Sequence, residues 1–135
     1  MSHITRVMTK MTDIITVARA LAFLQIPCTI NNDVVTIPTK NTYNVTIFKR
    51  NDTIQLQADY IAWDSLANYE TIRKYYSKQK YPRITQERFA GVLQQAYNVV
   101  RAQEQAVALG HTMEISEPDT DGIIHARIMV GESSA

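Results

Sequence analysis

The segment from Cys28 to Tyr60 constrains the fold most strongly, because apolar and polar residues alternate along it in several short runs. A period of two is typical of antiparallel strands with one buried face and one wet face. The runs are separated by residues that tolerate the positive φ of tight turns, at 31–33 and at 49–52. We therefore expect four consecutive strands, near 28–30, 34–37, 43–47 and 54–60.

Helical periodicity flanks this block of strands on both sides. A short strand at 3–11 is expected first, followed by a helix that Thr12 or Asp13 caps and that stops before Pro27. A second helix is expected from a cap at Asp64 or Ser65 to about Gln79. The longest helix is expected from a Thr85 cap to Gly110, with Ile84 and Phe89 as a hydrophobic staple. One face of this helix is predicted to be buried, and it carries Phe89, Leu93, Ala96, Val100 and Val107.

The chain closes with a predicted hairpin. Met113 and Ile115 lead into a turn at 117–122, and Ile124, Ala126, Ile128 and Val130 alternate with polar residues on the way out. Runs of strands joined by tight turns favour an antiparallel sheet with helices packed on one face. The fold class is therefore α+β, a two-layer sandwich in the order strand, helix, four strands, helices, two strands. The strand-helix-four-strands-helix part has the same order as the TATA-binding-protein-like half-domain, an analogy of topology alone.

Length and composition indicate one globular domain. The chain has 135 residues, 45% of them apolar, and a formal charge of +1, which disfavours disorder and gives no global attraction to polyanions. We expect a single domain at 1–131 and a frayed end at 132–135. No apolar run reaches the roughly 20 residues of a membrane helix, and the first residues do not form a secretory signal. A cytoplasmic location is expected.

Dispersed residues resemble one known family. Ala58-Asp59 with Trp63, and Asp121-Gly122, are similar to the middle and the last hairpin of the uncharacterised family called hypothetical chloroplast reading frame thirty-five, found in red-algal plastids, cyanobacteria and cyanophages. The opening and the long helix carry the rest of the resemblance, at Met1-Ser2-His3, Ile4, Val7, Thr9, Met11, Ala20-Leu21, Leu24, Phe89, Leu93, Gln95, Tyr97 and Gly110.

The resemblance implies a small soluble domain with no assigned activity, and it supplies no catalytic or ligand residues. Two features depart from the family pattern. Tyr97-Asn98-Val99-Val100 stands where the family tends to show Tyr-Ala-Tyr-His, and no Arg-Trp pair follows Val130. A divergent member encoded by a phage, acting in the host cytoplasm, would fit these departures.

No catalytic, metal or cofactor motif stands out. The three histidines lie far apart in the sequence, Cys28 is the single thiol, and no glycine-rich phosphate loop is present. His3 is interpreted as the start of a strand and Cys28 as a core residue. An enzyme of unrecognised type around Asp59, Trp63 and His3 is the least favoured reading. We expect no enzymatic activity, no cofactor and no metal.

One segment, residues 73–88, has the composition of a nucleic-acid contact. It carries six basic residues against one acid, Glu87, with tyrosines between them. Basic groups neutralise phosphates and tyrosine rings stack on bases. The alternative is a solvated helix surface. The candidate contacts are Arg73, Lys74, Tyr75, Lys78, Lys80, Tyr81 and Arg83.

The last predicted strand suggests a protein interface. Its second face, which should be wet, carries Ile123, His125, Arg127 and Met129. Two apolar residues there indicate either a covering helix or a partner, and an exposed edge strand invites strand addition or symmetric pairing. The favoured hypothesis is therefore a non-enzymatic accessory or adaptor protein that contacts a protein partner or forms a homo-oligomer. Nucleic-acid binding through 73–88 is the alternative hypothesis.

Overall fold

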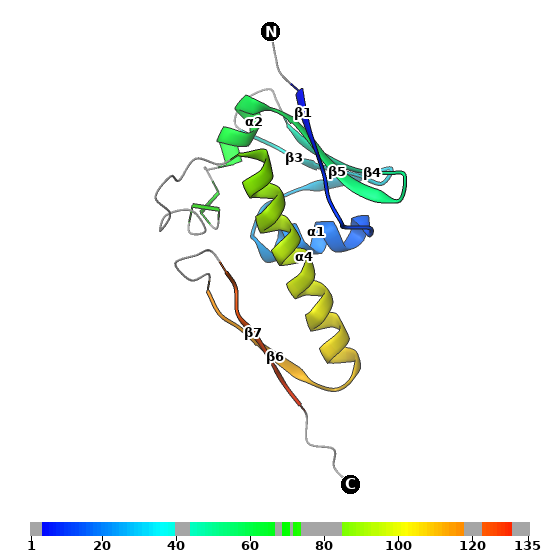
Figure 1. Cartoon of the computed structure of the whole chain (residues 1–135), viewed down its shortest axis with the longest axis vertical. Helices are drawn as coiled ribbons and strands as arrows, with labels where there is room; N and C mark the ends of the chain where they lie inside the picture. Colours follow the sequence, from blue (N-terminus) through cyan, green and yellow to red (C-terminus); the bar gives the residue numbers. More distant parts are fainter. Residues whose placement is uncertain are drawn as a thin grey trace.

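The computed structural model describes residues 4–39, 44–66, 69–70, 72–73, 85–117 and 123–130. Five strands form one antiparallel sheet, and the last two strands form a separate sheet. Helices lie on one face of the large sheet, and the final hairpin lies beyond the long helix (Figure 1). The predicted α+β class is confirmed. The elements are β1 (Ile4–Met8), α1 (Ile14–Phe23), β2 (Thr29–Asn31), β3 (Val34–Ile37), β4 (Val45–Arg50), β5 (Thr53–Asp59), α2 (Tyr60–Ser65), α4 (Gln86–Ala108), β6 (Thr112–Ile115) and β7 (Ala126–Met129).

The large sheet has the strand order β1-β5-β4-β3-β2. Strands β2 to β5 follow one another as hairpins, and β1 pairs with the free edge of β5. Asn32 and Asp33 turn between β2 and β3 with φ of 51° and 65°. Two left-handed residues in a two-residue loop match the right-handed twist of the strands.

The expected four-residue turn at 49–52 is too long. Lys49 and Arg50 belong to β4, where they pair with Ile54 and Thr53. The turn consists of Asn51 and Asp52, with φ of 52° and 64°. Polar composition made Lys49 and Arg50 look like turn residues, but both are exposed at the end of the sheet, where a charged strand residue remains hydrated.

The two faces of the sheet differ as the period of two predicts. Val35, Ile47 and Leu56 stand side by side across three strands, and none of them is exposed to solvent. The neighbouring positions Thr36 and Thr46 are only half-buried. One face therefore packs against the helices. The other face is half-buried or exposed at most of its described positions, although Gln55 and Asp59 of β5, which lie on it, are buried.

Helix α1 begins at the predicted cap. The Asp13 carboxylate accepts hydrogen bonds from the Ile15 amide at 3.1 Å and from the Thr16 hydroxyl at 2.8 Å. The helix ends at Phe23, and Gln25 has a φ of 60°. A left-handed residue reverses the chain, so the helix stops before Pro27 is reached. The buried apolar residues of this helix are Ile14, Val17, Ala20 and Leu21.

Helix α2 overturns the expected cap at Asp64 or Ser65. It begins at Tyr60, directly after β5, so both residues lie in its last turn. Trp63 is 3% exposed, and its ring centroid lies 5.8 Å from that of Phe89. Burial of this indole against α4 favours a helix here, a tertiary contact that local pattern could not reveal. The rest of the predicted helix to Gln79, with Pro82 and Ile84, lies mostly outside the described residues.

Helix α4 begins at the predicted Thr85 cap, whose hydroxyl accepts a hydrogen bond from the Arg88 amide at 3.2 Å. The predicted buried face is correct for Phe89, Leu93, Ala96 and Val100. It is wrong for Val107, which is 66% exposed. Helix α1 ends before it can cover this part of α4, so the apolar face continues into solvent.

Candidate functional site

Strands β6 and β7 form a hairpin that does not join the large sheet. Gly110 follows the end of α4 and has a φ of 76°. This left-handed conformation lets the chain turn back beneath the helix. The Ile124 amide donates a hydrogen bond to Gln95 Oε1 of α4 at 2.9 Å, and Ile124 is 9% exposed. This contact joins the start of the returning chain to α4. A groove of about 470 Å³ remains open between the helix and the hairpin.

The pairing register separates the hairpin into two sides. Met113 stands opposite Ile128, and Ile115 stands opposite Ala126. Met113 and Ile115 are partly buried against the core, so this side faces α4. The opposite side carries Glu114, paired with Arg127.

The four residues predicted as an interface are all exposed. His125, Arg127 and Met129 alternate along the outward side, and Ile123 precedes them. Ile123 is 48% exposed and Met129 is 39% exposed. The structure thus places all four on the surface of one hairpin, along the strand from which they were predicted.

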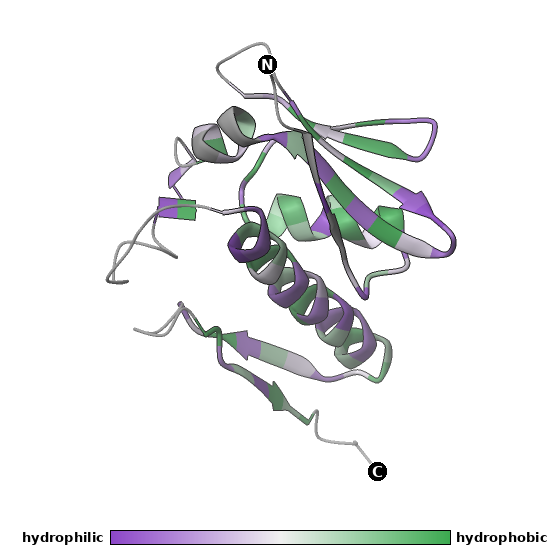
Figure 2. Ribbon diagram, turned by 45° about the horizontal axis from the view of Figure 1, so that its top comes forward, coloured by the Kyte–Doolittle hydropathy of each residue, from purple (hydrophilic) through white to green (hydrophobic). Residues whose placement is uncertain are grey.

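The side facing α4 also leaves apolar surface in water, which the sequence pattern did not reveal. Ile128 is 52% exposed and Val130, just after β7, is 73% exposed. Their alternation with polar residues is that of an ordinary buried strand face. They are exposed because β7 lies farther from α4 than β6 does (Figure 2), so residues on this face of β7 do not reach the helix.

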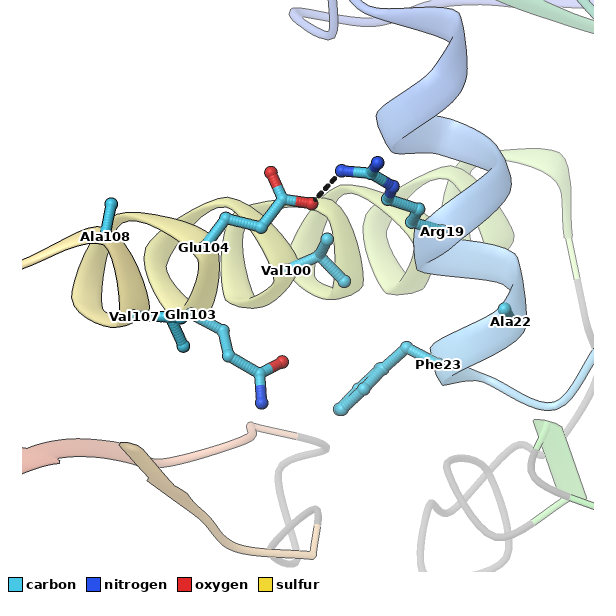
Figure 3. Close-up of a pocket in the computed structure, with 8 residues that line it drawn as sticks. All are labelled: Arg19, Ala22, Phe23, Val100, Gln103, Glu104, Val107 and Ala108. Carbon is cyan, nitrogen blue, oxygen red and sulfur yellow. Dashed lines mark hydrogen bonds and ion pairs between the residues drawn. The ribbon is translucent and has the colours of Figure 1, made fainter. Parts of the chain in front are cut away.

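A second apolar surface lies between the ends of α1 and α4, in a groove of about 640 Å³. Phe23 of α1 and Val107 of α4 point to the same side of this groove (Figure 3). Arg19 and Glu104 join the two helices through an ion pair of 2.5 Å. Both charged side chains are well exposed, so the pair contributes little to stability. The sequence pattern missed this groove because it placed Val107 in the core.

The basic segment 73–88 is described only in part. Arg73 is exposed and Arg88 is half-buried near the start of α4. The other predicted contacts lie outside the described residues, namely Lys74, Tyr75, Lys78, Lys80, Tyr81 and Arg83. The nucleic-acid hypothesis therefore stays a prediction.

An enzyme of unrecognised type would use Asp59, Trp63 and His3. Trp63 is a core residue, and Asp59 is 4% exposed at the end of β5. His3 lies outside the described residues. Cys28 is half-buried, and burial raises the pKa of its thiol. A raised pKa keeps the thiol protonated at neutral pH, which disfavours a nucleophilic role.

Within the described ranges, no group of three or more His, Cys, Asp or Glu side chains is placed to hold a metal ion. Nor does any helix there combine the length and the apolar character needed to cross a membrane.

Comparisons with protein families, with curated proteins and with solved structures found no match to this chain.

Proposed function

We propose that this protein is a non-enzymatic accessory or adaptor protein that acts through protein contacts made by the β6–β7 hairpin. One observation carries the proposal. Every residue of β7 is exposed, although the strand includes Ile128 and Met129. Ile128 and Met129 face opposite sides of the strand, and each side has a second exposed apolar residue, Val130 on the side of Ile128 and Ile123 on the side of Met129. Single apolar residues on a surface are ordinary, but grouped ones are typical of a binding surface.

The size of the hairpin supports this proposal. A two-stranded ribbon is marginally stable by itself in water and gains stability from whatever packs on it. Here the contact with α4 involves Ile124 and Gln95 at one end and the half-buried Met113 and Ile115. The remaining apolar surface of β7 would gain stability from a partner.

The family assignment is part of the same proposal and rests on the residues that resemble the chloroplast reading frame thirty-five family. Ala58, Asp59 and Trp63 from that set are buried, so they explain a shared fold better than a shared ligand. A protein of this family in a photosynthetic microbe or its phage would fit an adaptor role.

Photo-crosslinking tests the proposed function. A photoreactive amino acid is placed at position 129 and, in a matched control, at position 15, because Ile15 is also an exposed apolar residue, on α1. After irradiation in a lysate of the cells that encode the chain, specific adducts are expected at 129 and not at 15. The Arg127→Glu change should reduce them. Equal adduct patterns at the two positions would contradict the proposal.

A further inference from the structure

The backbone groups along the outer edge of β7 can be assigned from two hydrogen bonds. The Ser116 amide donates to the His125 carbonyl at 2.9 Å, and these residues stand opposite each other when the hairpin register is extended by one position. Hydrogen-bonded and non-hydrogen-bonded pairs alternate in an antiparallel ladder. Arg127 and Met129 therefore bond to β6, whereas Ala126 and Ile128 direct their N–H and C=O groups away from it.

The Ile124 amide agrees with this assignment. It belongs to the same outward set as Ala126 and Ile128, and it donates to Gln95 instead of to β6. The residues whose backbone N–H and C=O groups point away from β6 are thus Ile124, Ala126, Ile128 and Val130. The first of them, Ile124, already donates its amide to Gln95 of α4. Among the described strands, none pairs with this edge.

The outer edge of β7 carries neither a proline nor a bulge, two of the features that protect natural edge strands from pairing. Shortness and charge also protect edges, and β7 has four residues with one charged side chain, Arg127, which stands opposite Glu114 of β6. The β7 sequence is Ala126-Arg127-Ile128-Met129, and its register with β6 is continuous. Figure 2 shows this strand on the side of the hairpin away from α4. All four residues of β7 are exposed, which leaves the edge accessible to another extended strand.

We propose that β7 pairs antiparallel with β7 of a second copy of this chain, around a two-fold axis at Ile128. This inference rests on the proposed function, because it names the partner of the same hairpin. Each Ile128 exchanges two backbone hydrogen bonds with Ile128 of the other copy. The result is one four-stranded sheet, β6-β7-β7-β6, built across the two copies.

Charge and hydrogen bonding select this register. Outward groups must meet outward groups, so among the described residues the axis can lie at Ala126, Arg127, Ile128 or Met129. An axis at Met129 pairs only Ile128 with Val130, whereas an axis at Ile128 pairs Ile128 with itself and also Ala126 with Val130, so it forms more backbone hydrogen bonds. An axis at Arg127 places two guanidinium groups opposite each other, which is destabilising. An axis at Ala126 requires the Ile124 amide, which Gln95 already occupies.

The axis at Ile128 is also chemically complementary. It aligns Met113, Ile128 and the same two residues of the second copy in one apolar row across four strands. On the other side, Arg127 stands between Glu114 of its own copy and Met129 of the second copy. Opposite charges therefore neighbour each other, and like charges do not face each other. A second copy of the chain therefore supplies partners for the outward N–H and C=O groups of β7, and no strand of a different sequence is needed.

The contact is expected to be weak and dependent on concentration, because two short strands bury less than the ~1,200 Å² of a standard stable interface. Amide hydrogen exchange on the intact chain measures it directly. As protein concentration rises, the Ile128 amide should become protected. The Arg127 and Met129 amides, already bonded to β6, should change little and serve as internal controls.

Disulfide trapping tests the register in a Cys28→Ser background. Facing Cα atoms in a hydrogen-bonded pair are about 5.5 Å apart, within the roughly 4.4–6.8 Å that a disulfide spans. Ile128→Cys should therefore yield a covalent dimer of twice the 15.4 kDa chain mass on mild oxidation. Arg127→Cys should not, because the two positions become diagonal neighbours about 7–8 Å apart.

Loss of self-association on charge insertion completes the test. Ile128→Lys should remove the concentration-dependent protection and the rise in mass measured by light scattering. The matched variant Ile15→Lys, on α1, should keep both. A chain that stays monomeric at high concentration, or that traps efficiently through Arg127→Cys, overturns the proposal. Crosslinks from position 129 to a different protein would then leave the proposed function standing, and their absence would remove it too.

Discussion

At the residue scale, the junction between β1 and α1 is held by two side chains from distant parts of the chain. Asp13 caps the helix, and the Tyr97 hydroxyl of α4 accepts hydrogen bonds from the Thr12 and Asp13 amides at 3.3 and 3.1 Å. The cap is visible in the sequence because it is local. Tyr97 is separated in the sequence from Asp13 by 84 positions and from Thr12 by 85. No local sequence pattern predicts a contact over that separation.

Replacement of Asp13 should destabilise the fold in a manner that depends on pH. The hydrogen bond from the Thr16 hydroxyl, aided by that from the Ile15 amide and opposed by burial, lowers the pKa of the Asp13 carboxyl. Its contribution is therefore complete above the unfolded-state pKa of about 4 and is lost as pH falls through the lower folded-state value. Asp13→Ala should cost about 1 kcal/mol at pH 7.

Urea unfolding at several pH values checks this prediction. Asp13→Asn is the matched control, since it retains a capping oxygen but does not titrate. It should keep most of the stability at pH 7 and lose the acid-dependent part. Equal stability of the wild type and Asp13→Ala at pH 7 would show that the cap contributes nothing.

Removal of the Tyr97 hydroxyl should loosen the same junction. Tyr97→Phe leaves the Thr12 and Asp13 amides to water, because both residues are exposed, so a loss of about 0.5–1.5 kcal/mol in unfolding free energy is expected. Tyr97→Leu also removes ring packing and should cost more. Faster hydrogen exchange of the Thr12 and Asp13 amides in Tyr97→Phe would identify the site of the loss, and unchanged exchange would refute it.

At the scale of elements, helical periodicity predicted what α4 could bury but not how far its neighbours reach. Phe89 and Val107 belong to the same predicted face, yet Phe89 is fully buried and Val107 is 66% exposed. The difference arises because Trp63 of α2 covers Phe89, whereas Val107 lies at the open groove where α1 ends at Phe23. The terminal hairpin shows the same effect, since its alternation was predicted but its isolation from the large sheet was not.

Two substitutions on that one predicted face should therefore differ sharply. Phe89→Ala removes a ring that packs against Trp63 and should cost about 3–5 kcal/mol. Val107→Ala should change the unfolding free energy by less than about 0.5 kcal/mol. Chemical denaturation of both variants measures the difference, and similar losses would mean that Val107 is covered in solution.

At the scale of the whole molecule, the chain forms three levels: the sheet, the helices and the hairpin beyond α4 (Figure 1). The core lies between the sheet and the helices, and the hairpin meets it mainly through Ile124, Met113 and Ile115. This arrangement leaves the surface of the hairpin available for contacts without disturbing the core.

The nucleic-acid hypothesis belongs to this scale and is tested by fluorescence anisotropy with labelled single-stranded and duplex oligonucleotides at two salt concentrations. Binding through phosphates should weaken steeply as salt rises. Charge reversal at Arg73, Lys74 and Lys78 should abolish it. Reversal at Lys49 and Arg50 on β4 is the matched control and should not. Absence of binding at low salt would remove this hypothesis.

The sequence by itself determined the α+β class, the consecutive hairpins, a cap at Thr12 or Asp13, the cap at Thr85 and the left-handed Gly110. All of these depend on neighbours within a few residues, where propensity, capping and turn chemistry act. Tertiary structure decided the early start of α2, the exposure of Val107 and the accessibility of β7. Each of these depends on which distant element covers a given face, because burial is a property of the assembled molecule and not of a local pattern.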